Sequence, residues 1–190
     1  MNFDRAATLA EFDDAIDTLE RVLRECPEEL WEAPAWRVER TDPWVWPASG
    51  VEPMPERTEE TIQSLAAVWA IAYHCLWFLD FYCTTDMATH ESPGYVRGGP
   101  EERFPAPDGA APIPSPVYPR ETLLKFLDHG RTKARDVIPG LTDADLAAPL
   151  PAGHPHYGKT FEQLLSVNLA HLHEHGGQLL AFIERSAPVA

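Results

Sequence analysis

Apolar residues recur at steps of three and four along four segments of the chain, which is the spacing of one face of an α-helix. The first segment runs from Thr8 to about Cys26, where the letters TLAE form a capping box with Glu11 and Pro27 follows directly. Its apolar stripe consists of Leu9, Phe12, Ile16, Leu19, Val22 and Leu23. The spacing predicts an amphipathic helix that buries one face.

A second helix is expected from about Thr58 to Thr85. The stretch 65–83 within it is almost free of charge for 19 residues, which is long enough to span a bilayer. However, His74 lies at its centre and Asp80 near its end, and an ionisable residue inside a bilayer is costly. A buried central helix therefore accounts for this pattern better than a membrane span.

Two further helices are expected in the second half of the chain. One opens at Pro119 and runs to about Val137, because Pro139 and Gly140 stop it. A short helical turn over 142–146 follows, with a capping pattern in the letters TDAD. The last helix extends from Thr160, where TFEQ forms a capping box, to about Arg185.

Two long proline-rich connections, 27–57 and 86–118, separate the first three helices. The first connection contains Trp31, Trp36, Trp44 and Trp46, which is four of the six tryptophans. Packing on the helices is the favoured role for these indoles, and lining a ligand pocket is the second interpretation. Connections of this length permit parallel neighbours, and the four helical segments predict an all-α fold. It is a four-helix bundle in up-down-down-up order with two long irregular connections, in a single domain over 1–190.

Composition limits the partners of this bundle. With 30 acidic and 15 basic residues the formal charge is -15, which repels phosphate backbones and anionic lipid, so we expect neither nucleic acid nor membrane as a partner. Cys26, Cys75 and Cys83 form no CxxC pair, and the N-terminus has no apolar signal segment. These features indicate a reducing, cytoplasmic location.

The last helix carries a seam of polar residues between apolar ends. Reading it at alternating steps of three and four selects Phe161, Leu164, Asn168, His171, His175, Gln178 and Phe182. The neighbouring seam is apolar, so the four polar side chains should point into the core or to its edge. Burying each of these polar side chains without a partner costs about 1–3 kcal/mol, so the polar residues of this seam require a partner.

A metal ion is the partner that this pattern favours. His171 and His175 are spaced i, i+4, the arrangement of two-histidine motifs on zinc-binding helices, and His74 is the only histidine in the apolar second helix. Either signal alone has an ordinary explanation, a hydrogen-bonded core histidine or a chance pair on an exposed helix. Their conjunction predicts one divalent metal ion, zinc or nickel, held by His74, His171 and His175. The other histidines are expected at the surface or in loops: His90, His129, His154, His156 and His173.

The letters HLHEH also fit the H-x-x-E-H pattern of inverted zinc peptidases, in which Glu174 would be the base. Those enzymes need a further acidic ligand well downstream, and only 15 residues follow His175. This interpretation is therefore disfavoured. The chain also lacks a G-x-S-x-G elbow, a phosphate-binding glycine loop and a dinucleotide fingerprint.

Three phrases together, YHCLWFLDFY, LTDADL and TFEQLLSVNLAHLHEHGGQLLAFI, resemble the DinB-like superfamily of small bacterial metal-binding proteins. The order of elements matches from Leu9 to Ile183, although only the HxxxH-x-G-Q core is specific. The resemblance implies that His74, His171 and His175 bind zinc or nickel, with Gln178 at the family's glutamine. The chain reads HEHGGQ where the commonest motif reads HHRGQ, which leaves ligation intact and puts any role of that arginine in doubt.

Three neutral histidines leave a coordination position open, as in catalytic metal sites. Characterised members of the superfamily include bacillithiol transferases and mycothiol-dependent isomerases. The resemblance therefore implies a transferase that adds a low-molecular-weight thiol, of mycothiol or bacillithiol type, to an electrophilic substrate. Gln178 and Asn168 are expected to contact a ligand histidine or the substrate.

Two alternatives stay open at this point. One is a metal-dependent hydrolase that uses a bound hydroxide, with Glu174 or Asp80 as base, although Glu174 points about 100° away from His175 on a helix. The other is a non-enzymatic bundle that binds metal or a small ligand. The two long connections are candidates for a pocket or for a contact between two copies, and we expect a homodimer.

Overall fold

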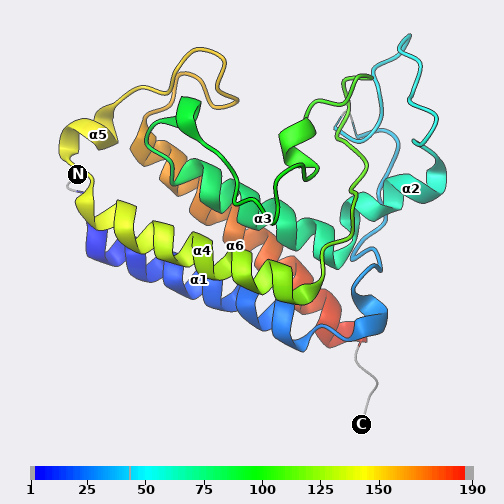
Figure 1. Ribbon diagram of the computed structural model, residues 1–190, viewed down its shortest axis with the longest axis horizontal. Coiled ribbons are helices and arrows are strands. Elements are labelled where there is room, and N and C mark those ends of the chain that lie inside the picture. The colour runs from blue at the N-terminus through cyan, green and yellow to red at the C-terminus, as the bar shows by residue number, and fades with distance from the viewer. Residues whose placement is uncertain (1–2, 43, 187–190) are drawn as a thin grey trace.

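The computed structural model describes residues 3–42 and 44–186, and over these residues it is all-helical, without a strand (Figure 1). Its long helices are α1 (Arg5–Glu25), α3 (Val68–Tyr82), α4 (Arg120–Val137) and α6 (Phe161–Ser186). The short helices are α2 (Glu59–Gln63) and α5 (Asp143–Ala147), with 3-10 turns η1 (Glu28–Leu30), η2 (Ser64–Ala66), η3 (Met87–Thr89), η4 (Glu101–Arg103) and η5 (Ile138–Gly140). The predicted fold class is confirmed.

The four long helices form a bundle in up-down-down-up order. In Figure 1, α1 and α6 run from left to right, whereas α3 and α4 run from right to left. Each helix packs on two neighbours: α1 and α3 lie on opposite corners, and both contact α4 and α6. The long connection 83–119 allows α3 and α4 to run parallel, which a short loop would forbid.

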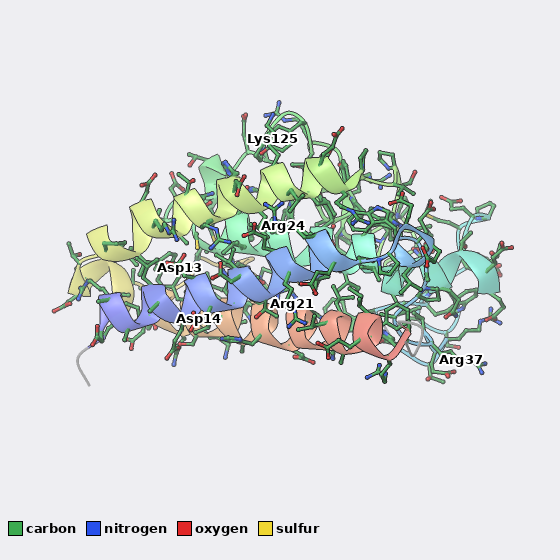
Figure 2. All side chains as sticks on the ribbon, turned by 90° about the horizontal axis from the view of Figure 1, so that it is seen from below. Asp13, Asp14, Arg21, Arg24, Arg37 and Lys125 are labelled. Atoms are coloured by element: carbon green, nitrogen blue, oxygen red, sulfur yellow. The ribbon has the colours of Figure 1, made fainter. Side chains whose placement is uncertain are left out.

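Apolar side chains from all four long helices meet along the bundle axis. The fully buried members include Phe12, Ile16, Leu19, Leu23, Trp69, Tyr73, Leu76, Leu79, Leu123, Phe126, Leu127, Leu164, Leu172 and Leu179. These are the positions that the period of three and four places on the inner faces. Figure 2 shows charged side chains such as Asp14 and Arg21 on the outer face of α1. Arg21 reaches across to Glu184 of α6 at 3.1 Å, an exposed pair of small energetic value.

The first helix begins earlier than the sequence predicts. Asp4 is its N-cap, and the Asp4 side chain accepts a hydrogen bond of 3.0 Å from the backbone N–H of Ala7. Because this cap lies one turn before Thr8, the predicted TLAE capping box is wrong and Thr8 lies inside the helix. The other two boxes are confirmed, at Thr142 and Thr160.

The predicted second helix is interrupted. The backbone is extended at Ala67, with ψ 142°, so that α2 and η2 end before α3 begins, and α3 ends at Tyr82. The first connection lies beside this break: Ala35 N–H donates to Ala66 O at 2.8 Å, and Trp69 N–H donates to Trp31 O at 3.1 Å. These bonds replace helical ones, and they fasten the first connection to the start of α3.

The two connections are joined by a buried ion pair. Arg57 donates two hydrogen bonds to Asp108, of 2.7 and 3.0 Å, and both side chains are only 1% exposed. The predicted packing of the tryptophans is right for Trp31, which is buried and donates its Nε1–H to Tyr118 O at 3.0 Å. It is wrong for Trp44, which is largely exposed. The bidentate pair fixes the two connections relative to each other.

The apolar stretch 65–83 contributes α3, which packs between α4 and α6. Among the helices of the described ranges 3–42 and 44–186, none has both the length and the apolar character needed to cross a bilayer. The sequence expectation that this stretch is a buried helix is consistent with that finding.

Two helical glycines provide a matched test of this packing. A Cβ at Gly130 would lie 2.6 Å from Leu79 Cδ2, whereas a Cβ at Gly177 would meet nothing within 4 Å. Gly177→Ala is expected to raise the free energy of unfolding by about 1 kcal/mol through helix propensity. In Gly130→Ala overpacking outweighs that gain, with an expected net loss of about 1 kcal/mol. Urea unfolding of both variants checks this, and equal midpoints would contradict the close α3–α4 contact.

Candidate metal centre

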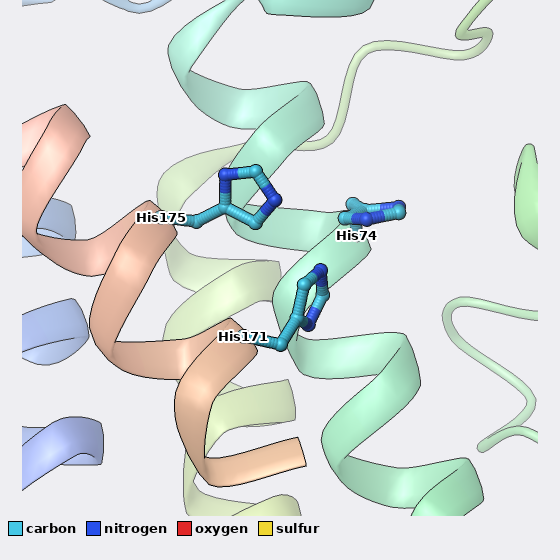
Figure 3. A group of neighbouring side chains, drawn as sticks. All are labelled: His74, His171 and His175. Carbon is cyan, nitrogen blue, oxygen red and sulfur yellow. The ribbon is translucent and has the colours of Figure 1, made fainter. Parts of the chain in front are cut away.

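Three histidines from two helices converge at one edge of the bundle (Figure 3). His74 comes from α3, and His171 and His175 come from successive turns of α6. The ring centroids are 4.8 Å apart for His74 and His171, 5.6 Å for His74 and His175, and 4.7 Å for His171 and His175. One nitrogen from each ring lies within 4.8 Å of the other two, so the group could hold a metal ion.

The packing of α6 explains this placement. Leu172 and Leu179 point into the core, and Gly176 lies buried against Thr18 of α1. His171 and His175 lie on the neighbouring face of α6, and this face therefore points toward α3 at the edge of the core. Both side chains are partly buried, as is His74.

Burial keeps two of these imidazoles neutral. It lowers the pKa of His171 to about 2, and the neighbouring His74 and His175 act in the same direction. It also lowers the pKa of His175, again with His74 adding to the effect. A metal ion binds the neutral imidazole, so the neutral state of these two rings is the one that ligation requires.

Hydrogen bonds orient two of the rings. His74 Nδ1 lies 2.8 Å from Glu101 Oε1, and His175 Nδ1 lies 2.9 Å from Gln178 Oε1. Both partners are acceptors, so each Nδ1 donates, and Nε2 is the nitrogen of each ring that is left to face a metal ion. A histidine that binds metal through one nitrogen usually donates from the other in this way.

The third ring gives a further indication. His171 Nδ1 is buried and has no hydrogen-bond partner among the described residues, and neither has the Oδ1 atom of Asn168 one turn earlier. Three neutral nitrogen donors match zinc or nickel. In a tetrahedral zinc site with bonds of about 2.0 Å the ligand atoms lie about 3.3 Å apart, a spacing that small side-chain rotations bring within reach. The residues present therefore fit a divalent metal ion.

Aromatic side chains wall the site on two sides. Phe78 lies edge-on to His74 and His171, with centroid separations of 4.8 and 5.5 Å. Trp36, from the first connection, lies nearly parallel to His175 at 6.2 Å. Trp36 thus borders the triad, and the second interpretation of the tryptophans, lining a ligand pocket, stays a prediction for it. Apolar walls of this kind limit the access of water to the rings.

The other predicted site residues take separate positions. Gln178 is exposed and contacts His175, whereas Asn168 is fully buried and its Nδ2 donates to Cys83 Sγ, at 3.9 Å. Asn168 makes no hydrogen bond to the three histidines in the described part of the chain, so its role at the site stays a prediction. His173 is exposed, as expected.

The two acids named as a hydrolytic base do not face the triad. Asp80 is fully buried, and its two carboxylate oxygens accept hydrogen bonds from His90, His129 and Lys133, so both oxygens are occupied. Glu174 is exposed, and its carboxylate accepts from Gln178 at 3.4 Å. Neither contact supports a base beside the metal site.

Glu101 is the site residue that sequence reasoning missed. It lies in the second connection among other acids, in a segment without periodicity, so nothing local distinguishes it. Its importance arises from the fold, which brings η4 beside the middle of α3.

Comparison with known proteins identifies the family of the chain. A family model described as the DinB superfamily matches residues 11–179, a range that contains the three histidines, Glu101 and Gln178. No curated protein and no solved structure gives a significant match to the chain.

Proposed function

The chain belongs to the DinB superfamily, and from this premise we propose that it binds one divalent metal ion, zinc or nickel, through His74, His171 and His175. We further propose that it is a transferase, which adds a low-molecular-weight thiol to an electrophilic substrate. The observation that carries the proposal is the convergence of three imidazoles at a partly open edge, two of them oriented by Glu101 and Gln178.

Three protein ligands leave a position for a small molecule, and the chemistry that a bound ion supplies there is a lowered thiol pKa, so that the nucleophilic thiolate forms near neutral pH. The chain's own residues do the rest. Glu101 and Gln178 hold two rings in one orientation, and Phe78 and Trp36 keep water from the sides of the site. A thiolate in a water-poor site is a stronger nucleophile than one in bulk water.

Support for a thiol of the mycothiol or bacillithiol type comes from the superfamily, whose characterised members include enzymes that use these thiols. The exposure of His74, whose side chain is 33% accessible, is consistent with an entrance for a second molecule from solvent. The electrophile would enter between the first and second connections, since Trp36 and Glu101 border the site from these two segments.

A thiol screen tests the reaction. Protein purified without a histidine tag and loaded with zinc or nickel is mixed with mycothiol, bacillithiol, glutathione, cysteine or coenzyme A, and with monochlorobimane as electrophile. We expect metal-dependent conjugation with at least one thiol, lowered at least about 100-fold in His171→Ala, because a ligand is lost. His173→Ala, on the same helix but exposed, should retain the parent rate. Equal rates with and without metal for every thiol would reject the transferase proposal.

A further inference from the structure

The second connection docks on α3 directly beside the metal centre. A Cβ at Gly99 would lie 1.9 Å from Tyr73 Oη, so only glycine allows the backbone to approach Tyr73 this closely. Tyr73 stacks on Tyr118 at 5.0 Å, and Tyr118 donates its hydroxyl to Val96 O at 2.9 Å. Because Tyr73 precedes His74, these contacts hold the segment 94–104 against the turn of α3 that carries a candidate ligand.

Glu101 is the acid that this docking brings to the site. Its Oε1 accepts from His74 Nδ1 at 2.8 Å, and its side chain is only 15% exposed. Its second oxygen, Oε2, is buried and has no hydrogen-bond partner within the described ranges. A carboxylate buried with half of its acceptors unused is costly unless positive charge lies nearby.

No arginine or lysine supplies that charge among the residues described. The nearest basic residue along the chain, Arg103, donates instead to Gly99 O at 3.3 Å and to Ser115 O at 2.6 Å. His74 is the single ion-pair partner that the described part of the chain offers to Glu101. A divalent cation on the far side of the His74 ring would compensate the carboxylate through the imidazole, as in carboxylate–histidine–metal arrangements.

We propose that Glu101 is a positioning residue that couples the second connection to metal binding. It fixes the His74 ring with Nε2 toward the site, and the bound metal in turn holds the segment 94–104 on α3. The inference rests on the proposed metal site, but not on the thiol reaction. Metal affinity and the order of this segment are therefore linked, and each should change when Glu101 is replaced.

Zinc affinity, measured by competition with a chromophoric chelator, tests the first half. Glu101→Ala is expected to bind zinc about 10–100-fold more weakly than the parent protein, since the orienting carboxylate is gone. Glu101→Gln keeps an acceptor without the charge and should fall between the two. The visible spectrum of the cobalt-loaded protein should also shift in Glu101→Ala. Glu102→Gln is the matched control, because Glu102 lies in the same turn and accepts from Gly98 N–H without touching a histidine.

Hydrogen exchange tests the second half. Zinc is expected to slow exchange over 94–104 in the parent protein and in Glu102→Gln, and to leave it unchanged in Glu101→Ala. Equal zinc affinities for the parent protein and Glu101→Ala, or an equal loss in Glu102→Gln, would overturn the coupling while leaving the metal site in place. A parent protein that binds neither zinc nor nickel would overturn the proposed function and this inference together.

Discussion

His171→Ala is expected to lose the metal ion completely at micromolar concentrations. The Nδ1 atom of His171 is buried, burial lowers the pKa of this ring to about 2, and its centroid lies within 5 Å of those of both other rings. Removal of His171 leaves only His74 and His175, the two rings whose centroids lie farthest apart, at 5.6 Å. Loss of a partner that only orients a ligand already costs about 10–100-fold in affinity, so loss of a ligand should cost more than about 100-fold.

Elemental analysis of untagged protein measures this directly. We expect about one zinc or nickel per chain in the parent protein, and near-zero content in His171→Ala and in His74→Ala. His173→Ala is the control, since this exposed histidine on the same helix lies outside the triad. Retention of the metal in both ligand variants would move the site elsewhere in the chain. Circular dichroism at 222 nm should show the same helix content in all of these proteins.

The triad was predictable from sequence because its signals are local. The i, i+4 spacing of His171 and His175 fixes their common face, and His74 stands out in an apolar helix. The order of the helices followed from the length of the connections, and the bounds of α4 and α6 from caps and prolines. In each case the residues that determine the structure are neighbours in the chain.

The features that the sequence did not predict depend on contacts between residues far apart in the chain. The break at Ala67 follows no glycine or proline, and it results from hydrogen bonds to the segment 31–35, more than 30 residues earlier. The role of Glu101 depends on the close approach of Gly99 to Tyr73, which no spacing rule anticipates. Asp80 was considered as a base, but its three partners come from α4 and the second connection. Long-range pairing of polar groups therefore limits what the sequence reveals.

The helices and the two connections contribute different parts of the site. The three candidate ligands lie on α3 and α6, which belong to the packed core, whereas Trp36 and Glu101 lie on the connections. Rigid helices suit the strict geometry of a metal, and loops suit the selection of a substrate. Changes in the connections should thus alter which molecules reach the site more than whether metal binds, with Glu101 as the exception because it touches a ligand.

The largest loss of stability is expected from Asp80→Asn, outside the metal centre. Asp80 Oδ1 accepts from Lys133 Nζ at 2.5 Å and from His129 Nε2 at 3.0 Å, and Oδ2 accepts from His90 Nε2 at 2.9 Å. Burial alone would raise the pKa of Asp80, but the hydrogen bonds from His90 and Lys133 outweigh it and lower the pKa to about 2. Asparagine leaves the Lys133 charge without its counter-ion, so the free energy of unfolding should fall by about 3 kcal/mol.

Urea unfolding at pH 7 measures this loss, with Asp128→Asn as control. Asp128 is an exposed acid on α4, and its change should stay within about 0.5 kcal/mol. Because the folded pKa of Asp80 lies below its ordinary value of 3.8, its contribution is present above about pH 4 and is lost as the pH falls toward 2. The difference between the parent protein and Asp80→Asn should therefore shrink over that range. A second change, Lys133→Met, removes the stranded charge and should restore part of the stability of Asp80→Asn, whereas a simple loss of packing at position 80 would leave the double variant no better than the single one.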